Sequence, residues 1–275
     1  MEGEPVSDEA MQEAFGFSMT ELNALREDEN PVIREIPKNL CVLCFDDALK
    51  SQYETALPIL ERLGFGATFY ITEMEGSEAT PAFEDKSTYL TWDQIREIEQ
   101  RGFEIGNHSL HHVSGSQNMG REFNMEQIRG MEVEFEAHGI SHPVSYAYPS
   151  GASNPEVVQC ARDCGYLWAR GNQVKGKDGI RGMTYYDPLV DSPLAVCSFG
   201  EPDFYTADFM KKRIAETPEG CIFGLTYHDV APETWKGSCS FEGQMELLKE
   251  MGMKVIAMRD LGAYIDPEKA WRYTI

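Results

Sequence analysis

The sequence has 275 residues, of which 42% are hydrophobic, and a formal net charge of −22 at pH 7. This length and hydrophobic content suit one main domain with a sizeable core. The acidic charge repels nucleic acid and anionic membrane surfaces, so we expect neither as a partner. No run of about 18 apolar residues occurs, and we therefore expect no membrane insertion.

Seven cysteines are scattered along the chain, several of them within apolar runs. Their odd number and their spacing predict reduced core thiols rather than a disulfide framework. The first residues, Met1 to Pro5, lack the basic and apolar regions of a signal peptide. The sequence as written therefore predicts a cytoplasmic protein, and an extracytoplasmic one if a leader has been trimmed away.

The first 38 residues are acidic and polar, and we expect residues 1–38 to form an N-terminal extension that packs on a main domain of residues 39–275. The composition changes at residues 40–45, a continuous apolar run of strand length that predicts a buried strand. A helical spacing of apolar residues over 53–63 follows, and residues 67–72 predict a second strand. Strand, helix and strand within about 30 residues indicate a parallel sheet.

The same alternation continues to the end of the chain. A capping box at Thr91 to Gln94 predicts a helix that runs to Gln100, and the next strand ends in a histidine-rich stretch, 104–112. About seven β/α units fit a closed or nearly closed barrel, and no glycine-rich dinucleotide motif follows a strand. Further helices are predicted at 122–138, 154–164, 207–215 and 242–251, and further strands at 144–148, 167–169, 195–199, 221–227 and 254–258.

Polar residues that can bind a metal or act in catalysis follow the predicted strands. The carboxyl ends of parallel strands in a barrel form one face. His108 and His112 are four residues apart, so both can reach one metal ion. Two histidines and one carboxylate suit a divalent ion such as zinc and leave positions open for water and substrate. A second carboxylate can act as the base, and a histidine on the opposite rim as the acid. The residues at this face are Asp46, Asp47, His108, His112, Ser150, Gly151, Arg170 and His228.

Four short motifs, in this order and spacing, resemble those of the polysaccharide deacetylases of carbohydrate esterase family 4, the NodB-homology domain, over roughly residues 39–260. They are Phe45-Asp46-Asp47, His108-Ser109-x-x-His112, Tyr148-Pro149-Ser150-Gly151 and Leu225-x-x-His228. The resemblance implies an α/β fold, a distorted (β/α) barrel of about seven parallel strands.

The resemblance also implies roles for individual residues. Asp46 resembles the catalytic base, and His228 the general acid. Asp47, His108 and His112 resemble the metal triad, which implies a divalent ion, most simply zinc, with cobalt, nickel or manganese as alternatives. The backbone N–H of Ser150 occupies the place of the group that polarises the acetyl carbonyl.

The sequence departs from the family pattern at several positions. The first motif usually ends in glycine, and this chain has Ala48. The third usually carries an arginine and a tyrosine, where this chain has Ala147 and Ser150, and no Asp-x-x-Asp-Trp motif follows the fifth strand. We hypothesise that Arg170 reaches Asp46 and replaces the missing arginine; a surface arginine paired with another carboxylate is the alternative.

The function expected from these residues is metal-dependent removal of acetyl groups from N-acetylated sugars of a glycan. Hydrolysis of another amide or ester on the same scaffold, including O-acetyl esters and small cyclic amides, is a second hypothesis, so the substrate is an acetylated glycan or a small molecule. A catalytically silent carbohydrate-binding domain is a third. Trp235, in the segment after His228, is the tryptophan expected at the substrate rim.

Overall fold

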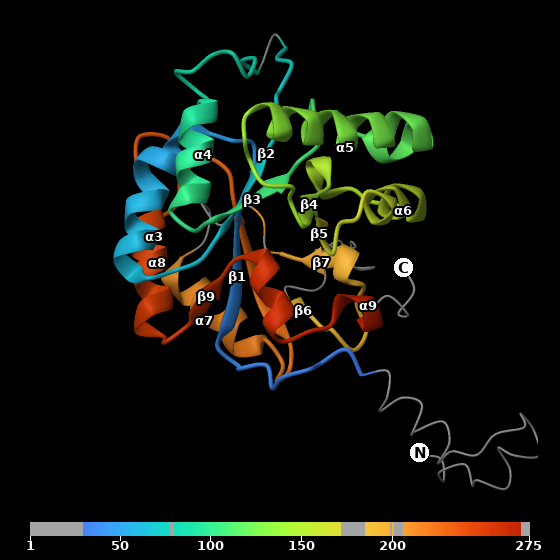
Figure 1. Cartoon of the computed structure of the whole chain (residues 1–275). Helices are drawn as coiled ribbons and strands as arrows, with labels where there is room; N and C mark the ends of the chain where they lie inside the picture. Colours follow the sequence, from blue (N-terminus) through green and yellow to red (C-terminus); the bar gives the residue numbers. More distant parts are fainter. Residues whose placement is uncertain (1–29, 78–79, 172–184, 199, 201–205, 271–275) are drawn as a thin grey trace, which may run out of the picture.

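In the residues that the structure describes, one sheet of nine strands forms the centre of the fold (Figure 1). The structure is a computed structural model that describes residues 30–77, 80–171, 185–198, 200 and 206–270. The strands run in the order β6-β8-β1-β2-β3-β4-β5-β7, and β9 pairs with β1. They are β1 (Leu40–Phe45), β2 (Thr68–Ile71), β3 (Glu104–Asn107), β4 (Ser145–Ala147), β5 (Trp168–Gly171), β6 (Tyr185–Tyr186), β7 (Val196–Cys197), β8 (Ile222–Tyr227) and β9 (Lys254–Ile256).

The first strand is the central element because it pairs with three others. Its carboxyl-terminal half lies between β8 and β2, and its first residues, Leu40 to Val42, pair with β9. All six residues of β1 are buried, as expected for a continuous apolar run with both faces covered. Every strand pair in the described residues is parallel except β6 with β8.

The two ends of the sheet approach each other and nearly close a barrel. Ser198, just after β7, lies with its Oγ 2.6 Å from Oγ1 of Thr226 in β8. At Gly224 in β8, an added Cβ would lie only 2.6 Å from the carbonyl oxygen of Cys197. The seven parallel strands from β8 through β1 to β7 therefore form a distorted (β/α) barrel, which confirms the predicted fold class.

Helices cover the outside of the barrel, with α3, α4 and α8 grouped on one side and α5 and α6 on another (Figure 1). The expected caps are present: Gly64 ends α3 in the left-handed conformation, and Thr91 and Gln94 form the capping box of α4. The helices are α3 (Leu57–Leu63), α4 (Trp92–Gln100), α5 (Gly120–Ala137), α6 (Pro155–Asp163), α7 (Ala207–Glu216), α8 (Phe241–Glu250) and α9 (Pro267–Ala270).

One local element departs from the expected regular helix over 53–63. Residues Gln52–Ala56 form a π-helical turn, η1, which leads directly into α3. A π turn widens the helix and often occurs beside functional sites. Here it follows the carboxyl end of β1 by a few residues. The described residues also form the 3₁₀ segments η2 (Ser116–Asn118), η3 (Pro149–Gly151), η4 (Pro193–Ala195) and η6 (Met258–Ala263).

The barrel interior is partly polar. Glu104 of β3 is 2% exposed, and its carboxylate accepts hydrogen bonds from Thr68 Oγ1 and Ser145 Oγ, both at 2.7 Å, and from the Arg259 N–H at 2.8 Å. Burial raises the pKa of Glu104, although these three donors act against that shift. A buried carboxylate with three donors ties together β2, β3, β4 and the segment after β9.

The chain before β1 packs against the chain after β9. Val32 forms a bridge with Ile265, and the buried Ile36 joins the same hydrophobic cluster. Most of the predicted N-terminal extension, residues 1–29, lies outside the described residues, so the boundary between residues 38 and 39 stays a prediction. Among the helices that the structure describes, none is long and apolar enough to cross a membrane.

Candidate metal and catalytic site

Two consecutive carboxylates leave the carboxyl end of β1. Asp46 continues the strand, since its N–H donates to the Tyr227 carbonyl of β8 at 2.9 Å. Asp47 then turns away with φ of 71°, in the left-handed region. The side chain of Asp46 is 4% exposed and that of Asp47 18%. Both carboxylates line the same cavity at the carboxyl ends of the strands.

Two of the three clustered histidines face these carboxylates. Nε2 of His108 lies 3.5 Å from Asp47 Oδ1 and 3.7 Å from Asp46 Oδ2. Nε2 of His112 lies 3.6 Å from Asp47 Oδ1. His111 points elsewhere, with its Nδ1 3.1 Å from the Glu73 carbonyl oxygen. The structure thus separates two converging imidazoles from a third that is adjacent in sequence.

The ring of His108 is oriented by a backbone carbonyl. Its Nδ1 lies 2.8 Å from the carbonyl oxygen of Ala147, at the end of β4. Because a carbonyl can only accept, Nδ1 carries the hydrogen in the neutral ring and Nε2 presents its lone pair to the cavity. Holding a ligand histidine in this way fixes its tautomer and strengthens it as a metal ligand.

The donor atoms fit a divalent cation. Asp47, His108 and His112 each offer one atom, and the three atoms lie within 4.8 Å of one another. Tetrahedral ligands at the usual zinc distances are about 3.4 Å apart, close to the two Asp47–histidine distances. Asp47 Oδ1 and His108 Nε2 are buried, and no hydrogen-bond partner for either lies within the described part of the chain. Buried polar atoms rarely lack a hydrogen-bond partner, and a cation bound by both atoms would satisfy them.

Charge in the cavity also favours a cation. Burial opposes ionisation of Asp47, but the nearby imidazoles of His108, His228 and His112 outweigh it, so the pKa of Asp47 lies well below its usual range. Burial and the neighbouring His108 lower the pKa of His112 to about 4. Its imidazole is therefore neutral at pH 7 and available as a ligand.

Asp46 is held by Arg170 from across the barrel. Nη2 of Arg170, in β5, donates a hydrogen bond to Oδ2 of Asp46. The guanidinium also lies over the ring of Tyr70, 5.6 Å from its centroid. Arg170 is 2% exposed, and the pKa of its guanidinium is raised because Asp46 outweighs the burial that would lower it. The hypothesised contact between these two residues is present, on the strand next to the one where the family pattern has its arginine.

His228 and Ser150 complete the rim of the cavity. His228 follows β8, is 44% exposed and places Nε2 3.8 Å from Asp46 Oδ2. Ser150 lies in the turn after β4, with its Oγ 3.2 Å from that of Ser114. The cavity has a volume of about 290 Å³. All seven residues to which the sequence assigned a role line it, together with Gly151, Gly200 and Thr226.

Backbone strain is concentrated at this site. Within the described residues, every non-glycine residue with positive φ lies in a loop that carries a cavity residue: Asp47, Ala48, Ser109, His112 and Ser150. Such conformations cost roughly 1–3 kcal/mol each and persist where the surrounding structure imposes them. The φ of 53° at Ala48 also explains why glycine suits this position in the motif.

One expectation about a side chain requires revision. Trp235 does not line the cavity: its ring stacks on Tyr227 with centroids 6.2 Å apart, packs edge-on against Phe241, and its Nε1 donates to the Cys239 carbonyl. Packing against these two rings buries apolar surface of Trp235 that a position on the rim would leave exposed. Two supporting groups were also missed, the carbonyl of Ala147 and the side chain of Gln52. A backbone carbonyl leaves no signal in the sequence, because every residue has one.

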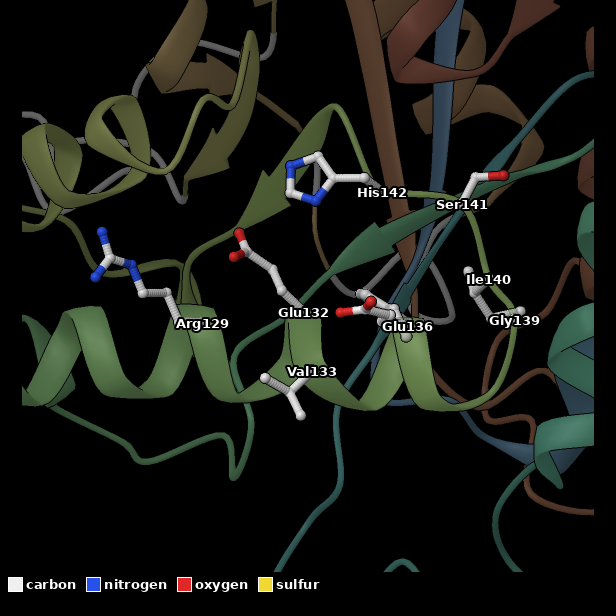
Figure 2. Close-up of a pocket in the computed structure, with 9 residues that line it drawn as sticks. Arg129, Glu132, Val133, Glu136, Gly139, Ile140, Ser141 and His142 are labelled. Carbon is white, nitrogen blue, oxygen red and sulfur yellow. The ribbon is translucent and has the colours of Figure 1, made fainter.

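A second cavity lies outside the barrel and contains none of the predicted site residues. Its volume is about 650 Å³, and it follows the carboxyl-terminal half of α5 and the segment after it (Figure 2). Glu132 projects from α5 on the side of His142 (Figure 2) and accepts a hydrogen bond from the Tyr166 hydroxyl at 3.0 Å. The predicted site residues are therefore in the smaller cavity, at the end of β1.

Comparison with known proteins agrees with the motifs. The sequence pattern of the polysaccharide deacetylase family matches residues 34–169. YxkH of Bacillus subtilis, a protein assigned to the polysaccharide deacetylases, is 27% identical over 132 residues, which cover 47% of this chain and 44% of YxkH. The peptidoglycan-N-acetylglucosamine deacetylase of Bacillus cereus is 25% identical over 154 residues, 53% of this chain and 66% of that protein. The chain thus matches less than two thirds of the length of either relative.

A solved structure shows the same fold. BA3943 of Bacillus anthracis, described as a pseudoenzyme of carbohydrate esterase family 4, superposes with a TM-score of 0.53 at 18% identity, over 81% of this chain and 65% of that one. A BA3943 mutant described as having restored enzymatic activity gives the same TM-score. The family pattern and the two relatives place residues 34–169 among the polysaccharide deacetylases, and this chain shares its fold with BA3943, which is described as belonging to carbohydrate esterase family 4.

Proposed function

We propose that this protein is a metal-dependent deacetylase that hydrolyses the N-acetyl groups of amino sugars in a glycan. The observation that carries the proposal is a single cavity in which a three-residue cation site adjoins an arginine-bound carboxylate and an exposed histidine. The B. cereus relative, named for deacetylation of peptidoglycan N-acetylglucosamine, suggests the substrate class.

Asp47, His108 and His112 would hold the divalent ion, most simply zinc. When bound, such an ion polarises a carbonyl oxygen and lowers the pKa of water. Asp46 accepts the proton of the attacking water, and the hydrogen bond from Arg170 orients its carboxylate. The N–H of Ser150 donates to the acetyl oxygen as negative charge develops on it. His228 donates a proton to the nitrogen as the C–N bond breaks, which leaves acetate and a free amine.

The geometry suits a base and an acid that act on the same substrate. Asp46 is buried and fixed by Arg170, whereas His228 is exposed and can meet a substrate that enters from solvent. The short distance between His228 Nε2 and Asp46 Oδ2, 3.8 Å, supports the proposal that both groups act on one carbonyl carbon.

The test is acetate release from N-acetylglucosamine oligomers and peptidoglycan by the zinc-loaded protein, with metal content measured on the same samples. We expect Asp46→Asn to bind zinc and lose turnover, and His108→Ala to lose both. His111→Ala is the matched control, because this adjacent histidine contacts the Glu73 carbonyl instead of Asp46 or Asp47. Its zinc binding and turnover should be unchanged.

Two other functions give different outcomes in the same assay. Turnover confined to acetylated xylan or to small amides would indicate an esterase or a small-molecule amidase on this scaffold. Zinc binding without turnover on any acetylated substrate would favour a catalytically silent domain, the class to which the BA3943 pseudoenzyme belongs.

A further inference from the structure

Gln52 connects the backbones of the two residues to which we assign acid and base roles. It is fully buried at the start of the π turn η1. Its Nε2 donates to the carbonyl oxygen of Asp46 and, at 3.2 Å, to that of His228. These two residues are 182 positions apart in sequence, and the side chain of Gln52 lies between them.

The hydrogen bonds of Gln52 begin where those of the sheet end. The last rung between β1 and β8 joins the N–H of Asp46 to the Tyr227 carbonyl. Beyond this rung the two chains turn into their loops. A primary amide carries two N–H donors, one for each carbonyl. Gln52 therefore extends the link between β1 and β8 by one step, to the residues that face the cavity.

The neighbouring residue holds the next part of the same loop. Ser51 Oγ donates to Asp229 Oδ1 at 2.7 Å and accepts from the Val230 N–H at 3.0 Å. Hydrogen bonds from Ser51 and Gln52 thus reach three consecutive residues after β8. The π turn at Gln52–Ala56 is the local structure from which Gln52 reaches both strand ends.

We infer that Gln52 is a positioning residue that sets the distance between the Asp46 carboxylate and the His228 imidazole. The inference rests on the proposed roles of these two residues. Catalytic groups need supports that hold them to within about 0.5 Å, and a displacement of about 1 Å costs roughly 10²-fold in rate. The two carbonyls that accept from Gln52 belong to Asp46 and His228 and not to the three proposed metal ligands, so its loss should affect the rate and spare the metal.

The test replaces the amide by a side chain of similar length that cannot donate, Gln52→Met. The matched control is Gln244→Met: Gln244 is also fully buried, but it lies in α8 and accepts a hydrogen bond from the Tyr227 hydroxyl at 2.6 Å, behind the sheet. We expect Gln52→Met to bind zinc fully and to lower kcat about 10²-fold with little change in KM. Gln244→Met should lose stability and keep kcat within roughly twofold.

Two outcomes would overturn the inference: a kcat for Gln52→Met as high as that of Gln244→Met, or a loss of zinc that accounts for the lower rate. If zinc-loaded wild-type protein releases no acetate from any substrate, the proposed function fails, and the position of His228 is read by NMR of its ring. Broadened or doubled His228 signals in Gln52→Met, with sharp signals in Gln244→Met, would then support the inference. Identical His228 signals in both variants would refute it.

Discussion

The guanidinium of Arg170 and the carboxylate of Asp46 form a buried ion pair between β5 and β1, strands that are not neighbours in the sheet. The residues are 124 positions apart, and both side chains are at most 4% exposed. The pair therefore links opposite walls of the barrel at the cavity, and it fixes the position of the proposed base.

Removing one partner of this pair should be strongly destabilising. Arg170→Met leaves a buried carboxylate without its counter-charge, which costs about 3–5 kcal/mol. Urea denaturation should show the corresponding fall in the midpoint. The double variant Arg170→Met with Asp46→Asn removes both charges and should recover part of the loss, as a double-mutant cycle would measure. Equal stability of the single and double variants would mean that the charge of Asp46 is compensated by another group.

Zinc binding should release more protons at low pH. Burial lowers the pKa of His108, but Asp46 and Asp47 outweigh it, so the pKa is raised. In the metal-free protein, protonation of His108 therefore adds stability that is complete below the ordinary value of about 6.5 and is lost as the pH rises through the raised pKa. Zinc requires the neutral ring.

Calorimetry in buffers of different ionisation enthalpy counts these protons. We expect about one proton per zinc from His108 near pH 6, fewer near pH 8, and weaker zinc binding at the lower pH. His112 contributes none in this range, since its pKa is lowered to about 4. A proton count independent of pH would contradict the raised pKa of His108.

Replacing the strained alanine of the first motif by glycine should change the stability of the protein very little. Ala48 has φ of 53°, where an alanine costs roughly 1–2 kcal/mol. Ala48→Gly relieves this strain and loses a buried methyl group of about 0.8 kcal/mol, so the net change in the free energy of unfolding should be within about 1 kcal/mol of zero. Ala147→Gly is the control in extended backbone, and it should lose about 1–2 kcal/mol. Thermal unfolding of the two variants should therefore separate them, and equal losses would argue against strain at Ala48.

Closure of the barrel should depend on Gly224. A Cβ at this position would lie 2.6 Å from the Cys197 carbonyl oxygen and 3.1 Å from Cα of Ser198. Since both are backbone atoms, Gly224→Ala must push β7 and β8 apart and should lower the melting temperature. Gly262→Ala is the control, because no atom lies within 4 Å of its added Cβ. An unchanged melting temperature for Gly224→Ala would show that the contact between β7 and β8 is dispensable.

Local signals in the sequence predicted the elements with good accuracy. The apolar run before Asp46, the glycine after Leu63 and the capping pair Thr91–Gln94 each correspond to an element boundary in the structure. Each of these features acts over a few residues, so the sequence contains all the information it requires. The alternation of apolar strands and amphipathic helices also predicted the barrel, because the faces of a parallel sheet need helices to cover them.

Other features depended on contacts that the sequence does not encode locally. The π turn at Gln52–Ala56 reads as an ordinary helix, and the two-residue strand β6 is too short to show a period. Trp235 was expected on the rim, but its ring found apolar partners in Tyr227 and Phe241. Each outcome was decided by the neighbours available in the folded chain.

The sequence by itself determined which residues reach the carboxyl face of the barrel, since that follows from strand position alone. Only the tertiary structure decided how they are held: Arg170 on Asp46, the Ala147 carbonyl on His108, and Gln52 between Asp46 and His228. The physical reason is that the end of a strand fixes only how far along the barrel axis a residue lies. A hydrogen bond across the barrel also depends on the distances between several strands, and the packing of the whole chain fixes those distances.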